Sequence, residues 1–186
     1  MRVPIPLAKA WRPFNHGPVT LVSAAHDGVE NVLAAAWVTP LDFDPPKLTV
    51  VLAADAYTRS LVEASRELVV QVPTVSMLDV IEGVGSTSGR DTDKWSAFGI
   101  QRVREPGVAA PLVDGCVAWM AARVIDEPDL AARYDLFVVE GTAAWVDDRV
   151  FTDGRLRDTI PDALRTVHHV AGGVYVVDGA IVRARA

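Results

Sequence analysis

The sequence contains very little cysteine and no surplus of positive charge. Its 186 residues include a single cysteine, Cys116, so the chain cannot form an internal disulfide. The formal net charge is −6, from 18 lysines and arginines against 24 aspartates and glutamates, and no basic run occurs. This balance argues against a broad surface for nucleic acid or for an anionic membrane, although it is compatible with a local basic pocket for one phosphate.

Long hydrophobic runs are also missing. No apolar stretch approaches the roughly 20 residues that a membrane-spanning helix needs. The first residues, MRVPIPLAKAW, hold too short a hydrophobic stretch, interrupted by proline, for a signal peptide. Together with the lone cysteine, these absences lead us to expect a cytoplasmic protein. Cys116 lies in the apolar segment CVAWMAARV, which indicates a packed core thiol rather than a nucleophile.

Several enzyme motifs are absent as well. The chain has no G-x-G-x-x-G, P-loop or G-x-S-x-G motif, and its four histidines form no helical metal motif, so we expect no bound metal. His168 and His169 are adjacent and point to opposite faces of an extended chain. The pair is compatible with a surface residue beside a packing residue, or with one histidine at the mouth of a ligand pocket.

Strand patterns dominate what is present. Half of the residues are hydrophobic and 23% are charged, as in a globular chain, and we expect residues 1–186 to form one domain. Strands are expected at 19–24, from 31 onward, and at 47–53, 68–73, 116–126, 136–147 and 173–184. Short helices are expected at 60–67 (with a capping box of Ser60 and Glu63), at 76–85 and at 92–99. Six or more strands with few short helices favour a mainly β, antiparallel barrel over a parallel nucleotide-binding sheet.

The stretch NVLAAAWVTPLDFDPPKLTVVL, residues 31–52, follows a tight turn predicted at His26–Gly28. Its alanines would let a flat ligand or another backbone approach closely. We expect a corner at Thr39–Pro40, where backbone groups leave the ladder, and a loop at Asp44–Pro46, because proline lacks the amide donor. Trp37 is compatible with a place beside a ligand, or with packing in the core or in a dimer interface.

Two polar stretches are candidates for binding a phosphate. In DAYTRSLVEAS, residues 55–65, a helix N-terminus would offer free amides and a partial positive charge, assisted by Thr58, Arg59 and Ser60. Plain N-capping is the alternative. In GVGSTSGRDTDKWSAFGI, residues 83–100, Lys94 could pair with a phosphate as a point charge, and a solvated loop is the alternative.

In their order and spacing, these motifs resemble the flavin reductase-like family, which has the FMN-binding split-barrel fold. The most specific segments are AAAWVTPLDFDPP, YTRSLVEAS and SGRDTDKW, within a resemblance that runs from about Val19 to Val177. The family implies a six-stranded antiparallel Greek-key barrel with a few short helices. It also implies a homodimer with flavin mononucleotide (FMN) near the subunit interface, and NADH or NADPH as reductant.

The resemblance also implies a set of site residues. The flavin ring would be bordered by Ala35, Ala36, Trp37, Val38 and Thr39. Thr58 would hold the phosphate, with Tyr57 and Ser60 near it. The phosphate and ribityl side of the cofactor would be closed by Ser88, Arg90 and Lys94. His169 matches an HHLGG-like segment on the nicotinamide side, although Ala171 stands where a glycine is common.

The activity implied by the resemblance is that of an NAD(P)H:flavin oxidoreductase. Electrons would pass from the coenzyme to bound FMN and onward to free flavin, to a monooxygenase partner or to another acceptor. No catalytic side chain is expected, apart from a possible role for His169, because the flavin does the chemistry. Two rivals remain: an FMN electron carrier reduced by a partner protein, and a flavin-free ligand-binding or interaction module, against which Thr58, Lys94 and AAAWVTP argue.

Overall fold

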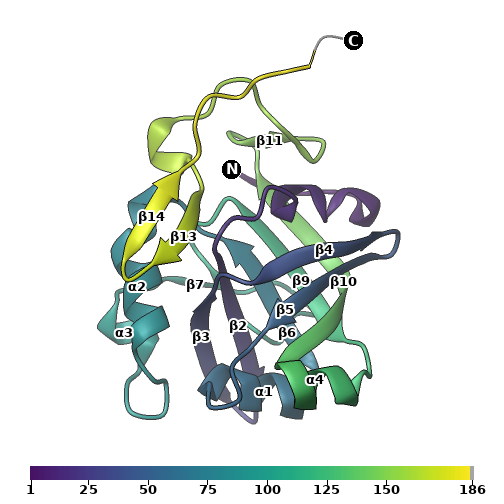
Figure 1. The fold of residues 1–186 in the computed structure, drawn as a ribbon, viewed down its shortest axis with the longest axis vertical. Helices are drawn as coiled ribbons and strands as arrows, with labels where there is room; N and C mark the ends of the chain where they lie inside the picture. The colour runs from purple at the N-terminus through teal and green to yellow at the C-terminus, as the bar shows by residue number, and fades with distance from the viewer. Residues whose placement is uncertain (185–186) are drawn as a thin grey trace.

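An antiparallel sheet of eight strands is the framework of the molecule (Figure 1). The computed structural model describes residues 1–184. Seven strands follow the order β3-β2-β6-β9-β10-β5-β4, and the eighth, β1, pairs with β10. Their bounds are β1 (Arg2–Pro4), β2 (Thr20–His26), β3 (Val29–Ala35), β4 (Val38–Phe43), β5 (Pro46–Val51), β6 (Glu67–Val72), β9 (Ala118–Val124) and β10 (Leu136–Asp147). The expected mainly β, antiparallel class is confirmed. Six of the seven expected strands lie in this sheet, and β1 and β4 add to them.

Short elements surround this sheet. Three two-stranded ribbons pair β7 (Arg102–Val103) with β8 (Leu112–Val113), β11 (Phe151–Thr152) with β12 (Arg155–Leu156), and β13 (Val167–Ala171) with β14 (Val174–Val177). The α-helices are α1 (Tyr57–Ser65), α2 (Leu78–Ser86), α3 (Lys94–Ala97) and α4 (Pro128–Tyr134). Helices α1 and α4 lie at one end of the sheet, and the β13–β14 hairpin lies beside α2 (Figure 1). Among residues 1–184, no helix is long and apolar enough to cross a membrane.

The central strands bury both faces. Along β6, Val69 belongs to one hydrophobic cluster, whereas Leu68 and Val70 belong to another on the opposite face. This alternation follows from the two-residue period of a strand, and it explains why LVVQV is almost continuously apolar. Cys116 is buried in the first of these clusters, as expected, and burial raises the pKa of its thiol, with a contribution from Asp114.

The hairpin turn between β2 and β3 is confirmed. Asp27 and Gly28 form its two-residue loop with φ of 48° and 77°. Positive φ at both positions is what a type I′ turn requires, and it matches the twist of the flanking strands.

The expected corner at Thr39–Pro40 is wrong. Thr39 pairs with Thr49 and Pro40 with Leu48, so both residues lie inside the β4–β5 ladder. Proline is tolerated there because β4 is the last strand of the sheet order and can leave one amide position unpaired. The break lies earlier, at Ala36–Trp37, between β3 and β4.

The expected capping box at Ser60 is also wrong. Helix α1 begins at Tyr57, with Ala56 at the N-cap, so Ser60 lies one turn inside the helix and its hydroxyl donates to the carbonyl oxygen of Tyr57 at 2.7 Å. Glu63 accepts instead from Nε of Arg59, at 2.8 Å. Because Glu63 pairs with the side chain four residues before it, it does not reach back to a serine at an N-cap.

Candidate functional site

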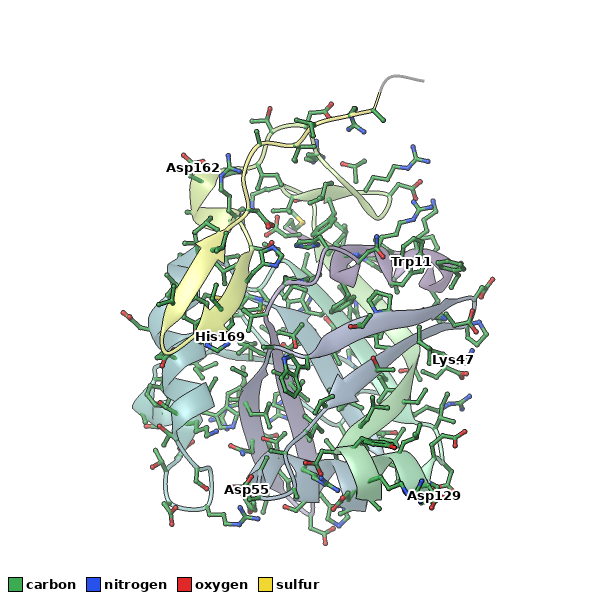
Figure 2. The ribbon with its side chains drawn as sticks, in the orientation of Figure 1. Trp11, Lys47, Asp55, Asp129, Asp162 and His169 are labelled. Carbon is green, nitrogen blue, oxygen red and sulfur yellow. The ribbon has the colours of Figure 1, made fainter. Side chains whose placement is uncertain are left out.

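A cavity of about 790 Å³, which we call the main cavity, opens between the end of β3, the start of α1, the end of α2 and the β13–β14 hairpin. That volume is typical of pockets for small molecules and cofactors. Figure 2 labels two of its lining residues, Asp55 just before α1 and His169 on the hairpin. The rest of the lining comes from 33–37, most of 51–58, 84–89 and 170–172, with Asn31, Lys94 and Asp135.

Most of the site residues predicted from the sequence meet on this cavity. Those that line it are Ala35, Ala36, Trp37, Tyr57, Thr58, Ser88, Lys94 and His169. Those that do not are Val38, Thr39, Ser60 and Arg90. Val38 is buried in the core and Thr39 is exposed in the β4 ladder, because successive residues of a strand point to opposite faces.

The two arginines of the predicted phosphate site are bonded to other groups of the protein. Arg59 donates to the carbonyl oxygens of Leu52 and Ala131 and forms ion pairs with Glu63 and Asp135. Burial opposes its charge, yet the two carboxylates raise its pKa. Arg90 donates to the carbonyl oxygen of Asp55 at 2.8 Å, and its guanidinium lies 5.1 Å from the centre of the Tyr57 ring.

One end of the main cavity, its polar end, is formed by Asn31, Thr58, Ser88, Gly89 and Lys94 beside the start of α1. Asn31 and Thr58 are almost fully buried, and Nδ2 of Asn31 donates to Oγ1 of Thr58 at 3.0 Å. Because Oγ1 accepts this bond, the hydroxyl proton of Thr58 remains available for a ligand. Asn31 was not predicted from the sequence as a site residue, since a lone asparagine in a strand carries no recognisable motif.

Gly89 is the second residue that sequence reasoning missed. A Cβ at this position would collide with the side chain of Asn31. Glycine therefore allows the loop after α2 to pack its backbone directly onto Asn31 at the cavity wall.

Lys94 is buried at the same end. Its Nζ donates to the carbonyl oxygens of Val32 at 3.0 Å and of Val84 at 2.7 Å, and so links β3 to the end of α2. Burial lowers its pKa to about 8. An ammonium group has three N–H donors, so the charge and one donor remain for an anion.

The start of α1 adds to this polarity. Its N-cap, Ala56, offers no side-chain acceptor, and the first turn contains no acidic residue. The first backbone amides of a helix are left without intrahelical partners and carry a partial positive charge. With Thr58 and Lys94 beside it, this helix start is suited to an anion such as a phosphate.

The other end of the main cavity is apolar. It is lined by Leu33, the alanines at 34–36, Trp37 and Val170. Trp37 is 74% exposed, so its packing in the core is excluded, whereas contact with a ligand or with a second chain remains open. Small side chains on this strand leave room for a planar ring against the backbone.

The hairpin separates the two adjacent histidines. His169 lines the cavity, with its ring 5.2 Å from that of Tyr175. His168 instead lies with Nδ1 2.9 Å from the carbonyl oxygen of Gly17 and with Nε2 2.7 Å from a carboxylate oxygen of Asp178, within hydrogen-bond distance of both. Burial opposes the ionisation of Asp178, but hydrogen bonds from His16, Thr166 and His168 outweigh it and lower its pKa.

Comparison with known proteins places this site in context. The family model described as "Flavin reductase like domain" matches residues 14–159. An uncharacterized protein YddH of Escherichia coli (strain K12) is 37% identical over 98% of this chain and 97% of its own length. A solved structure of an FMN-binding domain of a flavin reductases-like enzyme from Shewanella baltica OS155 is 43% identical, with a TM-score of 0.97 over 100% of this chain and 98% of its own. The flavoredoxin of Desulfovibrio vulgaris (Miyazaki F), at 22% identity and a TM-score of 0.74 over 90% of each chain, shares the fold.

Proposed function

The chain belongs to the flavin reductase-like domain family, and from that premise we propose that it binds FMN in the main cavity and acts as an NAD(P)H-dependent flavin oxidoreductase. The observation that carries the proposal is the pairing of a polar, anion-suited end with an apolar end in one cavity. FMN has a planar ring system at one end and a phosphate at the other, so the residues present fit it. The solved structure from Shewanella baltica, an FMN-binding domain, supports the same choice.

Each end has a task in this proposal. Thr58, Ser88 and Lys94, with the first amides of α1, hold the phosphate, while Ala35, Ala36 and Trp37 border the ring. When bound, FMN would supply the redox chemistry of hydride transfer from reduced nicotinamide. The protein orients the cofactor, and His169 contacts the nicotinamide coenzyme from the hairpin side. The electron acceptor is free flavin, a monooxygenase component or another acceptor.

An FMN electron carrier is the alternative on the same fold. The observation that favours it is the hairpin wall, since residues 169–172 border the cavity and could limit the access of a second ring. Reduction by a partner protein would then replace reduction by a nicotinamide coenzyme.

A homodimer is part of the proposal. The last strand of the sheet order, β4, exposes Leu41 and Phe43, at 56% and 63%, and the exposed Trp37 directly precedes this strand. An edge strand carrying large apolar side chains needs cover, and a second copy of the chain supplies it. Because Trp37 also lines the main cavity, the flavin would lie near this interface. Light scattering across a dilution series tests this, and a monomer with full flavin occupancy would contradict it.

One set of measurements decides among these functions. The purified protein is titrated with FMN and followed by its visible absorbance, and the FMN-loaded protein is then mixed anaerobically with NADH or NADPH. A reductase loses its flavin absorbance rapidly and turns over added free flavin. Bleaching by dithionite but by neither coenzyme would move the assignment to an electron carrier, and the lack of any FMN difference spectrum would refute cofactor binding.

A further inference from the structure

The β13–β14 hairpin is fastened at its base by several contacts. The backbone amide of Val19 donates to the carbonyl oxygen of Val167 at 2.8 Å, and that of Asp178 donates to the carbonyl oxygen of Thr166 at 3.0 Å. The bonds of His168 to Gly17 and Asp178 lie at the same level. The base is therefore joined to the sheet and to the preceding segment.

The outer half of the hairpin is the part that borders the main cavity, through residues 169–172. It ends in a two-residue turn at Gly172–Gly173, with φ of 56° and 76°. Its valines, Val170 and Val174, are more than half exposed. Apart from the partly buried ring of Tyr175, which packs against the core cluster that contains Val69, this half thus has little buried apolar surface of its own to hold it in place.

Tyr175 connects this outer half to α2. It is the cross-strand partner of His169, and the two rings lie 5.2 Å apart. Its hydroxyl donates to Oε2 of Glu82, on α2, at 2.8 Å. The end of α2 lines the same cavity through Val84, so this bond joins two of the cavity walls. Burial and the Glu82 carboxylate raise the pKa of Tyr175 to about 12, so the hydroxyl keeps its proton.

We propose that Tyr175 and Glu82 are positioning residues that hold His169 at the mouth of the main cavity, and so set how a nicotinamide coenzyme is received there. The proposal rests on the proposed function for the identity of the coenzyme. The ring of Tyr175 supports His169 from the neighbouring strand, and Glu82 fixes that ring through its hydroxyl. When the Tyr175–Glu82 hydrogen bond is removed, the contacts at the base of the hairpin remain, but His169 is no longer held in one position.

The first test uses no coenzyme, and it compares four variants in the FMN-loaded protein. Tyr175→Phe and Glu82→Ala remove the hydrogen bond, Glu82→Gln keeps an acceptor oxygen, and Tyr134→Phe is a matched control on the exposed face of α4. We expect the first two to accelerate amide hydrogen exchange in 169–174 roughly three- to tenfold, as expected for one hydrogen bond, and to shift the His169 ring resonances. In Glu82→Gln and Tyr134→Phe, the exchange rates and the His169 resonances should stay close to those of the wild-type protein. Unaltered exchange and resonances in Tyr175→Phe and Glu82→Ala would overturn the proposal.

The second test uses steady-state kinetics with NADH and NADPH. Tyr175→Phe should raise the KM for the coenzyme roughly three- to tenfold, with kcat and the Kd for FMN changed less than about twofold. A loss of FMN affinity as large as the rise in KM would overturn the positioning role, because the hairpin would then serve the cofactor. If the unchanged protein is reduced by neither coenzyme, the proposed function fails, while the exchange and resonance measurements still decide whether Tyr175 holds His169.

Discussion

The polar end of the main cavity and its hairpin wall differ in how they are held. Asn31, Thr58 and Lys94 are buried and bonded to one another or to the backbone of the sheet and α2. The hairpin wall lies on the surface, and its outer half is joined to α2 by the hydrogen bond of Tyr175 with Glu82. A buried, bonded site is preorganised, whereas an exposed one can adjust to what enters. Changes at the polar end should therefore act on the cofactor, and changes at the hairpin should act on its reductant.

The largest effect is expected from Gly89→Ala. The added methyl group would collide with Asn31 and displace either that side chain or the loop. Overpacking of this kind typically costs about 1–3 kcal/mol, so FMN affinity should fall roughly ten- to hundredfold. Gly179→Ala is the control, because no atom lies within 4 Å of a Cβ at that position. Titration of both variants with FMN measures the difference, and equal affinities would show that the contact with Asn31 does not shape the site.

The next effect is expected from Thr58→Ala and Lys94→Ala. Each should weaken the binding of FMN more than that of riboflavin, which lacks the phosphate. A charge-assisted hydrogen bond is typically worth about 1.5–3 kcal/mol, so the ratio of the two affinities should change about tenfold or more. Ser60→Ala removes a hydroxyl from the same helix away from the cavity and should leave the ratio unchanged. Equal losses for both flavins would place the phosphate elsewhere.

The pH dependence of FMN binding sharpens the same comparison. Burial lowers the pKa of Lys94 to about 8, so the side chain is charged below that pH and becomes neutral above it. A phosphate favours the charged form, and FMN affinity should therefore be highest below pH 8 and fall by up to roughly tenfold toward pH 10. Riboflavin binding over the same range is the control. A flat FMN-to-riboflavin ratio would separate Lys94 from the phosphate.

The smallest effect is expected at the hairpin wall. His169→Ala should slow the reduction of bound FMN by subsaturating NADH or NADPH at least as much as Tyr175→Phe raises the KM, roughly three- to tenfold, because one contact with the coenzyme is lost. The Kd for FMN should change less than about twofold, since the polar end is untouched. Anaerobic stopped-flow traces and an FMN titration give both quantities. A large loss of FMN affinity would show that the hairpin wall also binds the cofactor, so the two regions would not have separate roles.

Local signals in the sequence predicted much of the fold. Asp27-Gly28 specified its own turn, and the strand expected at 136–147 has the same bounds in the structure. Local signals failed at Ser60 and at Pro40. The capping box at Ser60 fails because Glu63 pairs with Arg59 instead. The corner at Pro40 fails because β4 lies at the end of the sheet order, where a strand tolerates proline.

The candidate site could be predicted only in part from the sequence, because some of its residues act through contacts between distant parts of the chain. Thr58 and Lys94 stand out because a hydroxyl at a helix start and a lysine in a glycine-rich loop suggest a phosphate. Asn31 and Gly89 do not, since their role comes from a contact between residues 58 positions apart in the chain. The ion pair of Arg59 with Asp135 spans a still longer separation and could not be foreseen from either residue alone.

The burial of Cys116 has a practical consequence. It is the single cysteine of the chain, it lies in the core, and the raised pKa of its thiol keeps it in the unreactive form. The natural protein is therefore suited to selective labelling: a cysteine introduced at the exposed Val174 would react alone with a maleimide dye or a nitroxide. Together with a second introduced cysteine, a probe at that position would report the movement of the hairpin as a distance between two labels rather than as a rate.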